Sequence, residues 1–416
     1  MASLPQPADF VADAAAPTSP VVIVGAGAAG LRVAEVLLDR DPGREIVLYG
    51  DEPWKPYDRL RLSALLMGEI GWDGIEHCLS LPDGHRVHLR YHCTVLHINR
   101  GARMIYDARG RAQPYSHLVL ATGSRPRIPQ IPGIQLSGVF TFRDFNDAER
   151  LRARSVRSRR AAVLGGGLLG LEAARALQRR GIEVTVVEHG ARLMAAQLDA
   201  VGAEQLREQV LRFGIHVRLG RGVKEIVGTT SVEGVVLADG YEVDCDTVVI
   251  ATGIVSNTDL ALKAGLSVGR GIRVDDALRT TDPRIYAVGE CAEHRGMIYG
   301  FVAPGLEQSA VAADNILGGK AGYRGSVTAA QLKVVGVPVF SMGRVGEEEN
   351  PMDLRQEIYA GASESIYRKL VLHRGRLVGA MAVGGWSQAG RAQEAITRGR
   401  RVWFWQLARF RRYGRL

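Results

Sequence analysis

The sequence predicts an α/β protein made of two Rossmann-like lobes, each suited to one dinucleotide, followed by a smaller α+β domain. Two glycine-rich segments of the same pattern carry this prediction, Gly25-Ala-Gly27-Ala-Ala-Gly30 and Gly165-Gly-Gly167-Leu-Leu-Gly170. Each follows an apolar run typical of a buried strand, Val21 to Val24 or Ala161 to Leu164. In such a segment the first glycine permits a tight turn, the second lets backbone amides approach a pyrophosphate, and the third lets helix and strand pack closely. Two copies in one chain therefore predict two bound dinucleotides.

A helix and a second strand follow each glycine-rich segment. Helical periodicity runs from Leu31 to Asp39 and from Leu171 to Arg180, and the next strands are Glu45 to Tyr49 and Glu183 to Val187. Because the first turn of a helix has unpaired N–H groups, each helix would point its positive end at the bound anion.

An acidic residue stands just past each second strand, Asp51 in the first lobe and Glu188 in the second. Each lies roughly 20 residues beyond its last glycine, where a carboxylate can accept hydrogen bonds from ribose hydroxyls. Glu52 competes with Asp51 for this role, and a solvated loop carboxylate is the alternative for both positions. A carboxylate at Glu188 would repel a 2′-phosphate and favours NADH over NADPH, a preference softened by nearby His189 and Arg192.

A second repeat supports the pairing of the lobes. Leu118-Val-Leu-Ala-Thr122-Gly123 recurs as Val248-Val-Ile-Ala-Thr252-Gly253, each roughly 90 residues after its own glycine-rich segment. Both are apolar strands that end in a turn of small residues, so both turns can pass close to a cofactor.

Composition narrows the chemistry. Of the 416 residues 46% are hydrophobic, and no apolar stretch approaches the length of a membrane span. The four cysteines show neither CxxC nor CxxxxC spacing, so a redox-active dithiol, an iron–sulfur cluster and a metal site are not indicated; they are Cys78, Cys93, Cys245 and Cys291. The first residues lack the charged start and apolar middle of a secretory signal, and we expect a cytoplasmic protein.

We expect four parts along the chain. Residues 1–19, rich in Ala and Pro, would be a disordered extension. Residues 20–138 and 253–322 would form the first lobe, residues 139–252 a second lobe inserted into it, and residues 323–416 the α+β domain. In this domain Ser365 to Leu372 and Leu377 to Val383 predict a β-hairpin, and a helix from about Gln388 to Arg398 precedes a basic tail.

Five further motifs are specific in combination: Pro56-Tyr57-Asp58-Arg59-Leu-Arg-Leu62-Ser63, Gly165 to Ala174, Leu193 to Asp199, Ile285 to Ala292, and Gly300 to Gly305. Together they resemble the FAD-dependent pyridine nucleotide-disulfide oxidoreductase superfamily. Within it the chain is most similar to the FAD- and NAD(P)H-binding half of the NAD(P)H-dependent nitrite reductase large subunit, over about residues 20 to 345.

The resemblance implies that the first lobe holds FAD and the second holds NAD(P)H. It would put Asp51 on the adenosine ribose of FAD, Arg59 along the FAD phosphate or flavin, and Gly289-Glu290 on the ribityl chain. A helix starting at Pro304 would direct its positive end at the flavin N1–C2=O edge and stabilise the anionic reduced form. The expected cofactor-binding residues are Gly25, Gly27, Gly30, Asp51, Arg59, Thr122, Gly123, Gly289, Glu290 and Pro304, with Gly165, Gly167, Gly170, Glu188 and Gly253.

The chain departs from its relatives at two points. Ferredoxin-type reductases have a lysine after the Leu-Ser of the first lobe, against the flavin and paired with a glutamate, whereas Ala64 stands here. Glu172 has no such lysine and is a candidate contact of the nicotinamide amide, with a capping or solvated role as the alternative. The chain also has no cysteine cluster and no sirohaem region, so it is not a whole nitrite reductase.

These features predict an enzyme, an NAD(P)H-dependent FAD oxidoreductase that transfers a hydride from NADH to FAD. Its electrons would pass to a separate, acidic partner such as a ferredoxin, a rubredoxin or a nitrite reductase-type component. The flavin carries the chemistry, so no catalytic side chain is expected; the two rings must stack within roughly 3–3.5 Å with water excluded. An NADH oxidase and a redox-sensing flavoprotein with a binding role remain alternatives. A peroxide reductase is disfavoured, because no cysteine lies between Asp41 and Asp51.

The formal net charge of +9 is concentrated at the end of the chain, where seven arginines follow Glu394 with no acid among them: Arg398, Arg400, Arg401, Arg409, Arg411, Arg412 and Arg415. Large aromatics alternate with them, among them Trp403, Phe404, Trp405 and Phe410. Three interpretations stay open. The aromatics dock the tail on the third domain, the tail lies on an anionic membrane, or the arginines steer an acidic electron carrier. Membrane contact is the least favoured, no nucleic-acid partner is expected, and the oligomeric state stays open.

Overall fold

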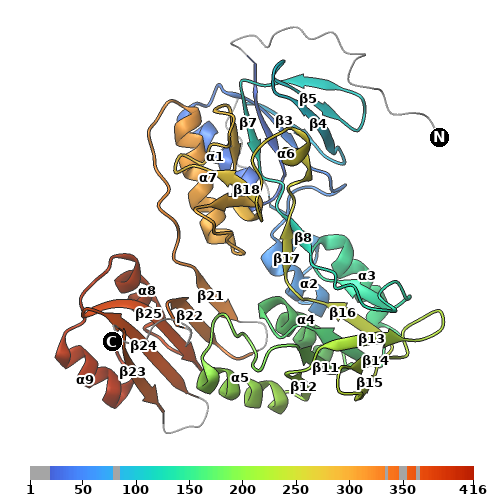
Figure 1. Cartoon of the computed structure of the whole chain (residues 1–416), viewed down its shortest axis with the longest axis vertical. Helices are drawn as coiled ribbons and strands as arrows, with labels where there is room; N and C mark the ends of the chain where they lie inside the picture. Colours follow the sequence, from blue (N-terminus) through green and yellow to red (C-terminus); the bar gives the residue numbers. More distant parts are fainter. Residues whose placement is uncertain (1–18, 78–84, 333–335, 346–353, 362–365) are drawn as a thin grey trace. The chain divides into compact units, whose positions relative to one another are not determined.

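The computed structural model describes residues 19–77, 85–332, 336–345, 354–361 and 366–416 (Figure 1). Its contacts divide into two units. The first contains the described residues up to Asp58, Ile75–Arg125 and Ile254–Ser326, and the second contains Arg59–Gly74, Pro126–Gly253 and Val327–Leu416. The expected extension before residue 20 lies almost wholly outside the described residues, and the domain boundaries drawn from the sequence stay a prediction.

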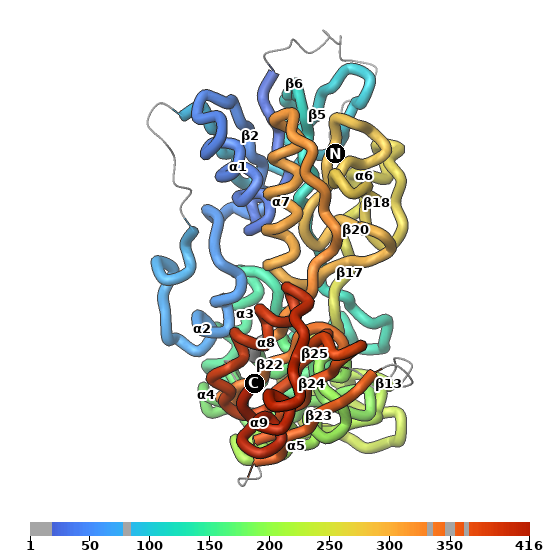
Figure 2. Tube along the Cα trace, turned by 90° about the vertical axis from the view of Figure 1, so that its left-hand side faces the viewer, coloured from blue at the N-terminus to red at the C-terminus, as the bar shows by residue number. Residues whose placement is uncertain are grey.

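The first unit is built on a parallel sheet with strand order β19-β7-β1-β2-β3. These strands are β19 (Ile285–Ala287), β7 (His117–Leu120), β1 (Val21–Val24), β2 (Glu45–Tyr49) and β3 (Arg86–Arg90). Helices α1 (Ala28–Arg40) and α7 (Val302–Ile316) lie side by side in both views (Figures 1 and 2). Their apolar faces join the core of the sheet through residues such as Leu37, Ala312 and Ile316. The chain thus returns after residue 253 to complete the first lobe.

Smaller elements complete this unit. They are an antiparallel sheet of β4 (Val95–Asn99), β5 (Met104–Asp107) and β6 (Ala112–Pro114), the strand pairs β8 (Ser124–Pro126) with β17 (Ile254–Ser256) and β18 (Ile272–Val274) with β20 (Ala292–His294), the helix α6 (Asp259–Lys263) and the 3-10 turn η4 (Gly289–Cys291).

The second unit contains a parallel sheet of the same plan, with strand order β12-β11-β10-β16-β9. These strands are β12 (Ile215–Leu219), β11 (Glu183–Glu188), β10 (Arg160–Leu164), β16 (Thr247–Ile250) and β9 (Val139–Thr141). The other elements of this lobe are η2 (Arg59–Arg61), α2 (Leu62–Met67), η3 (Trp72–Gly74), α3 (Phe145–Ser155), α4 (Leu168–Arg179), α5 (Ala200–Arg212), β13 (Val223–Val227), β14 (Gly234–Leu237) and β15 (Glu242–Asp244). In both lobes the strand before the glycine-rich segment lies in the middle of the sheet. The predicted α/β class with two Rossmann-like lobes is confirmed.

The C-terminal part of the second unit is an antiparallel sheet with strand order β21-β22-β25-β24-β23. The strands are β21 (Ala329–Leu332), β22 (Val339–Gly343), β25 (Arg376–Val383), β24 (Tyr367–His373) and β23 (Leu354–Ala360). The predicted hairpin is present, because β24 pairs with β25 and His373 lies opposite Arg376. Side chains on one face, including Leu370, Leu372 and Ala380, pack with α8 (Ala389–Thr397) and α9 (Phe404–Tyr413).

The basic tail differs from the expectation, because most of it forms α9. Leu407 and Phe410 are buried and dock this helix on the sheet, where the Phe410 ring lies 6.3 Å from that of Trp386. Trp403, Phe404 and Trp405 are exposed. The interpretation that the aromatics dock the tail is therefore correct for Phe410 and wrong for these three. At the start of this helix the Trp403 amide donates to Gln406 Oε1 at 2.9 Å.

Among the described residues, no helix combines the length and the apolar character needed to cross a membrane.

Candidate functional site

The second glycine of each glycine-rich segment has a role that contacts within the protein do not explain. A Cβ atom added at Gly27 or at Gly167 would meet no protein atom within 4 Å. Each of these glycines is the N-cap of a helix, α1 or α4, whose first-turn amides have no partner in the helix itself. An open, Cβ-free approach to a helix N-terminus suits a pyrophosphate, so both lobes pass this test of fit to a dinucleotide.

The first and third glycines are required by the fold itself. A Cβ at Gly25 would lie 2.1 Å from the Ala121 carbonyl oxygen, and one at Gly165 would lie 2.3 Å from that of Ala251. Both residues have a positive φ, +118° and +117°, that favours glycine. A Cβ at Gly30 or Gly170 would likewise collide with the carbonyl oxygen of the first glycine, at 1.9 Å and 2.0 Å. The repeated Ala-Thr-Gly turn thus abuts the first glycine in each lobe.

A group of polar residues follows this turn in the first lobe. Thr122 and Asn257 bind each other twice, since Thr122 Oγ1 donates to the Asn257 carbonyl and Asn257 Nδ2 donates to the Thr122 carbonyl, both at 2.8 Å. Ser124 Oγ donates to Glu290 Oε2 at 2.8 Å, and Ser256 Oγ donates to the Glu290 carbonyl at 2.7 Å. Ser124 and Ser256 therefore orient Glu290, the expected ribityl-binding residue, whereas Asn257 holds Thr122. The sequence reasoning missed all three, although Ser124 directly follows the Ala-Thr-Gly turn.

Helix α7 packs against Gly289, the residue before Glu290. Gly289 has φ +78°, and its N–H donates to Gln308 Oε1 at 2.7 Å in the fully buried core. Gly305 comes close to Gly289, since an added Cβ would lie 3.4 Å from the Gly289 Cα. The helix begins at Val302 and not at Pro304, so the predicted start is wrong by two residues. Pro304 is still in the first turn, where a missing N–H leaves no helical hydrogen bond unmade. Gln308 lies four residues after Pro304, and this helical spacing was the available sequence signal.

The two lobes differ in how they present their acidic residue. The Gly25 amide donates to the Tyr49 carbonyl and the Gly165 amide to the Val187 carbonyl, so Gly50 in the first lobe is the counterpart of Glu188. Asp51 stands one residue further on and is exposed. The rival acid, Glu52, accepts a 2.6 Å hydrogen bond from the Tyr57 hydroxyl.

Glu188 is held firmly by the backbone. Its Oε2 accepts from the Gly166 amide and its Oε1 from the Gly190 amide, both at 2.6 Å. Each carboxylate oxygen has a second lone pair, so the group can also accept from a ribose diol. The side chain is thus oriented before any ligand arrives.

Glu172 on α4 has a partner that the sequence did not indicate. Ser63 Oγ on α2 donates to Glu172 Oε2 at 3.0 Å, and Ser63 is buried. Burial raises the pKa of the Glu172 carboxyl, and the Ser63 hydrogen bond opposes part of that rise. Ser63, the residue before Ala64, thus provides a hydrogen-bond partner for Glu172 in place of the lysine that ferredoxin-type reductases have at the next position.

The remaining expected site residues are Arg59, Gly123 and Gly253. Arg59 begins η2 in the second unit. Thr252 Oγ1 donates to the Arg127 carbonyl at 2.6 Å, and the Arg127 amide donates to the Gly253 carbonyl at 2.9 Å. A Cβ at Gly123 or Gly253 would meet nothing within 4 Å, although both have positive φ.

The described cysteines are poor candidates for a reactive thiol. Cys93, Cys245 and Cys291 are buried and free. Burial raises the pKa of all three thiols, that of Cys245 to about 12. Cys291, next to Glu290, donates to the carbonyls of Leu120 and Val288, both at 3.3 Å. A high thiol pKa opposes nucleophilic chemistry, as expected for Cys291. Among the residues with a described position, no group of three or more His, Cys, Asp or Glu could hold a metal ion.

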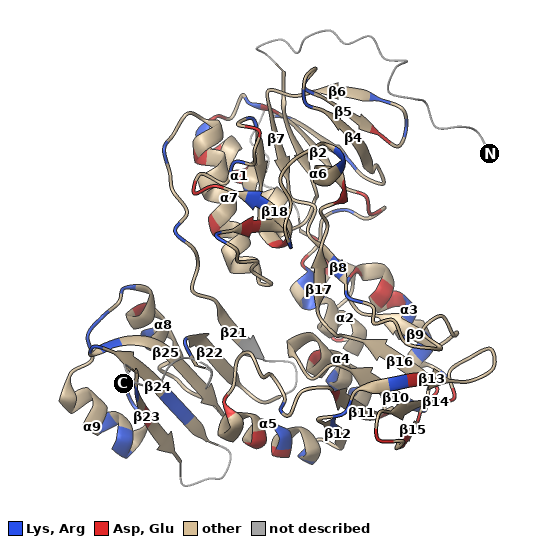
Figure 3. Ribbon diagram, in the orientation of Figure 1, with Lys and Arg blue, Asp and Glu red and all other residues tan. Residues whose placement is uncertain are grey.

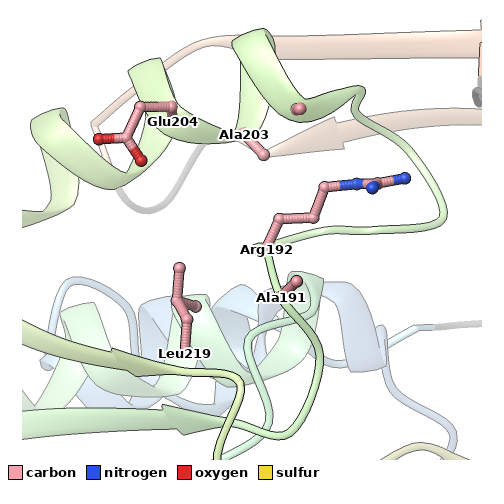
Figure 4. A pocket seen from close by; sticks show the side chains of 6 residues that line it. Ala191, Arg192, Ala203, Glu204 and Leu219 are labelled. Atoms are coloured by element: carbon pink, nitrogen blue, oxygen red, sulfur yellow. The ribbon is translucent and has the colours of Figure 1, made fainter.

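A small pocket of about 260 Å³ lies beside the loop that follows Glu188 (Figure 4). Ala191, Arg192 and Leu219 line one side of it, and Ala203 and Glu204 of α5 line the other. Arg192 is also fixed here, since its Nε donates to the Leu198 carbonyl at 3.2 Å. Leu219 in its lining is the strand partner of Glu188, so the pocket lies near the expected ribose site.

Comparisons with known proteins agree with this geometry. The family model described as pyridine nucleotide-disulphide oxidoreductase matches residues 19–315. The chain belongs to the pyridine nucleotide-disulphide oxidoreductases. Members bind FAD and NAD(P)H, so this oxidoreductase is an NAD(P)H-dependent flavoenzyme, as the sequence predicted. A model described as the rubredoxin NAD+ reductase C-terminal domain matches residues 329–400.

Three relatives illustrate the range of this oxidoreductase family. A nitrite reductase [NAD(P)H] of Bacillus subtilis is 40% identical over 381 residues, 89% of this chain and 46% of the relative. An assimilatory nitrate reductase electron transfer subunit of the same organism is 36% identical, over 92% of this chain and 50% of the relative. The structure of the ferredoxin reductase for the CYP199A2 system of Rhodopseudomonas palustris is 29% identical, with a TM-score of 0.85 over 94% of this chain and 97% of that one. The chain thus spans about half the length of the two curated relatives.

Proposed function

We propose that this oxidoreductase takes a hydride from NADH and delivers electrons to a separate acceptor protein. When bound, FAD accepts the hydride and gives up the electrons in turn. The observation that carries the proposal is the pair of dinucleotide cradles, each with a second glycine whose approach is left open by the protein. The described cysteines support an acceptor outside the chain, because they are free and buried and so provide no resident dithiol. The names of the relatives, an electron transfer subunit and a ferredoxin reductase, agree with this.

In the first lobe, the chain's own residues would bind and orient FAD. Gly25, Gly27 and Gly30 would cradle the pyrophosphate, and Asp51, one residue past the strand, would reach the adenosine ribose. Glu290, oriented by Ser124, would accept from the ribityl hydroxyls. Thr122, Gly123 and Gly289 would supply a narrow turn for the cofactor, and the first turn of α7 with Pro304 would supply positive potential. Arg59 is proposed as a contact of the FAD phosphate or flavin.

In the second lobe, Gly165, Gly167 and Gly170 would bind the pyrophosphate of the nicotinamide dinucleotide, and Gly253 would line the cradle. Glu188, held by two backbone amides, would bind the ribose hydroxyls and repel a 2′-phosphate, which favours NADH. Glu172, with its raised pKa and its Ser63 partner, would contact the carboxamide of the nicotinamide. No side chain is assigned a proton-transfer step.

Two finer points belong to the same proposal. The acceptor is taken to be acidic, because the chain carries a net charge of +9 with its arginines concentrated near residue 400. A cytoplasmic location is proposed because the described cysteines form no disulfide, as is usual for proteins in a reducing compartment.

The test is a reduction cycle followed under anaerobic conditions. NADH should bleach the flavin absorbance at a rate no slower than catalytic turnover. Adding an oxidised [2Fe–2S] ferredoxin should then restore the flavin absorbance while the ferredoxin becomes reduced. If ferredoxin is not reduced and the flavin is reoxidised quickly only when air is admitted, the result would support an NADH oxidase. A reduced flavin that persists with every acceptor as a charge-transfer complex would support a redox sensor.

A further inference from the structure

Three consecutive aromatic side chains are exposed where helix α9 begins. Trp403, Phe404 and Trp405 have relative exposures of 53%, 78% and 55%. The two tryptophan rings are stacked with centroids 5.3 Å apart, and the Phe404 ring packs edge-on against Trp405 at 5.1 Å. We call these three residues the aromatic cluster. Such a contiguous apolar patch is unfavourable in water and is typical of an interaction site.

The aromatic cluster is not needed to hold the helix in place. Leu407 and Phe410 on the other side of α9 are buried against the sheet. The Gly414 carbonyl, just past the helix, accepts hydrogen bonds from Trp386 Nε1 at 3.0 Å and from Arg368 Nη1 at 2.9 Å. Arg411 of α9 is bound to the buried carboxylate of Glu357. Helix α9 is thus held on the sheet by contacts that do not involve the aromatic cluster.

Arginines border the aromatic cluster. The turn between β24 and β25 lies against the segment before α9. The Val402 amide donates to the Gly375 carbonyl at 2.9 Å, and the backbones of Arg376 and Arg401 pair as an isolated antiparallel β-bridge. This contact brings Arg374 and Arg376 beside Arg400 and Arg401, all of them exposed. Figure 3 shows this basic edge of the C-terminal sheet and the basic residues of α9. We call Arg374, Arg376, Arg400 and Arg401, together with Arg398 and Arg409, the arginine border.

Little negative charge offsets this border among the described residues. Glu394 is shared by Arg398 and Arg400, at 2.8 Å and 2.9 Å. No ion pair is recorded for Arg374, Arg376, Arg401 or Arg409 within the described part of the chain. The surface therefore combines an apolar centre with a strongly positive rim, a composition in which Trp and Arg dominate, as in the energetic centres of protein interfaces.

We propose that the aromatic cluster and the arginine border form the docking surface for an acidic protein, and that this protein is the electron acceptor. The inference rests on the proposed function and adds to it the place where the partner binds. The aromatic rings would be desolvated against an apolar patch of the partner, while guanidinium groups pair with its carboxylates at the rim. The match to the rubredoxin reductase C-terminal domain ends at residue 400, so the cluster lies beyond the matched residues.

The experiment compares the reduction of an acidic [2Fe–2S] ferredoxin with that of a small neutral quinone, both driven by NADH. The cluster variant is Trp403→Ser/Phe404→Ser/Trp405→Ser, and the border variant is Arg374→Ser/Arg401→Ser/Arg409→Ser. Matched controls remove other exposed side chains, Val156→Ser/Leu262→Ser and Arg157→Ser/Arg159→Ser/Arg324→Ser. All should retain their flavin and their rate with the quinone.

Both docking variants should lose about tenfold or more in kcat/KM for ferredoxin, chiefly through KM, because central aromatic and arginine residues carry most of an interface's affinity. Ferredoxin reduction by the wild type should slow steeply with salt, and the border variant should show a flatter dependence. The controls should behave as the wild type.

Three outcomes would overturn the docking proposal: ferredoxin kinetics unchanged in both variants, equal losses with ferredoxin and quinone, or a wild type that reduces the quinone but not ferredoxin. Sedimentation with vesicles of equal phosphatidylglycerol and phosphatidylcholine is the remaining arm. If the wild type binds these vesicles, the cluster variant does not, and the ferredoxin kinetics of both are the same, the surface would be assigned to lipid instead. A wild type that reduces neither acceptor with NADH would instead contradict the proposed function itself.

Discussion

Single glycines in the two lobes separate what the fold requires from what a ligand requires. At Gly25 and Gly30 an added Cβ would lie within about 2 Å of a carbonyl oxygen. Any residue with a side chain would therefore require the backbone to move at these positions. At Gly27 and Gly167 the space is open. Substitutions at these two positions can therefore report on cofactor binding with the fold intact.

Gly27→Val should give a folded protein that lacks FAD, because the branched side chain would occupy the approach to the pyrophosphate. Flavin absorbance per chain measures the loss of FAD, and far-ultraviolet circular dichroism measures whether the protein is folded. Gly167→Val serves as the reciprocal control and should keep its flavin while losing saturation by NADH. Gly385→Val, at another open position, should change neither. Full flavin content in Gly27→Val would show that the first lobe is assigned to the wrong dinucleotide.

Glu188→Ala should narrow the preference for NADH over NADPH, by about tenfold in the ratio of kcat/KM values, since a carboxylate that binds the diol also repels the phosphate. Glu183→Ala at the exposed start of the same strand is the matched control. A wild type that already favours NADPH would remove the basis of the prediction.

Glu172 should make stability depend on pH. Its pKa is raised in the folded state by burial, so the folded protein holds a proton that the unfolded chain releases. The free energy of unfolding should therefore fall as the pH rises from the pKa of Glu172 in the unfolded chain, about 4.3, through its higher pKa in the folded protein. Glu172→Gln should be more stable than the wild type near neutral pH, and the two should converge at lower pH. Thermal unfolding midpoints across this range test it, and parallel curves for both proteins would refute it.

Helix α7 is tied to the FAD cradle by one buried hydrogen bond, from the Gly289 amide to Gln308 Oε1. Gln308→Leu would leave that amide buried without an acceptor, at a cost of about 1–3 kcal/mol. We expect weaker FAD retention during dilution or gel filtration, together with a lower unfolding midpoint. Leu306→Ala, on the exposed side of the same helix, should leave both unchanged. Unaltered FAD retention in Gln308→Leu would mean that this bond does not position the cradle.

Elements with strict periodicity could be predicted, and elements defined by contacts could not. Both parallel lobes, their strands and the hairpin from Tyr367 to Val383 follow from apolar runs and glycine spacing. The start of α7 was misplaced because Pro304 is allowed at any position of a first turn. Helix α9 was missed because two buried residues, Leu407 and Phe410, give too few points for a helical period. In the site, the glycines and Glu188 came from spacing, whereas the partners of Ser63, Ser124 and Gln308 lie in other segments of the chain, so spacing alone did not reveal these contacts.

In the second unit, a buried ion pair joins the C-terminal sheet to the start of α5. Lys369 Nζ of β24 lies 3.0 Å from Asp199 Oδ2, and Tyr367 donates to the same oxygen at 2.8 Å. Both charged side chains are nearly inaccessible, at 3% and 5%. Asp199 also caps α5 through the Gly202 amide, so the C-terminal sheet is joined to the loop that follows Glu188.

Lys369→Met should destabilise the protein by about 3–5 kcal/mol, since it leaves a buried carboxylate without its cation. Chemical denaturation measures the loss. The double variant Asp199→Asn/Lys369→Met should recover part of it, because no unpaired charge remains. Glu149→Gln, which breaks an exposed pair with Arg152, should cost less than about 1 kcal/mol. A single Lys369 variant as stable as the wild type would show that water or another cation reaches Asp199.

The buried thiols have a practical consequence for spectroscopy. Because Cys93, Cys245 and Cys291 have raised pKa values and no access to solvent, maleimide reagents should not modify them in the native protein. With Cys78 replaced by serine, a single new cysteine would be the sole labelling site. Arg409→Cys, on the exposed side of α9, could then carry a spin label or a fluorophore whose signal reports the arrival of a partner directly.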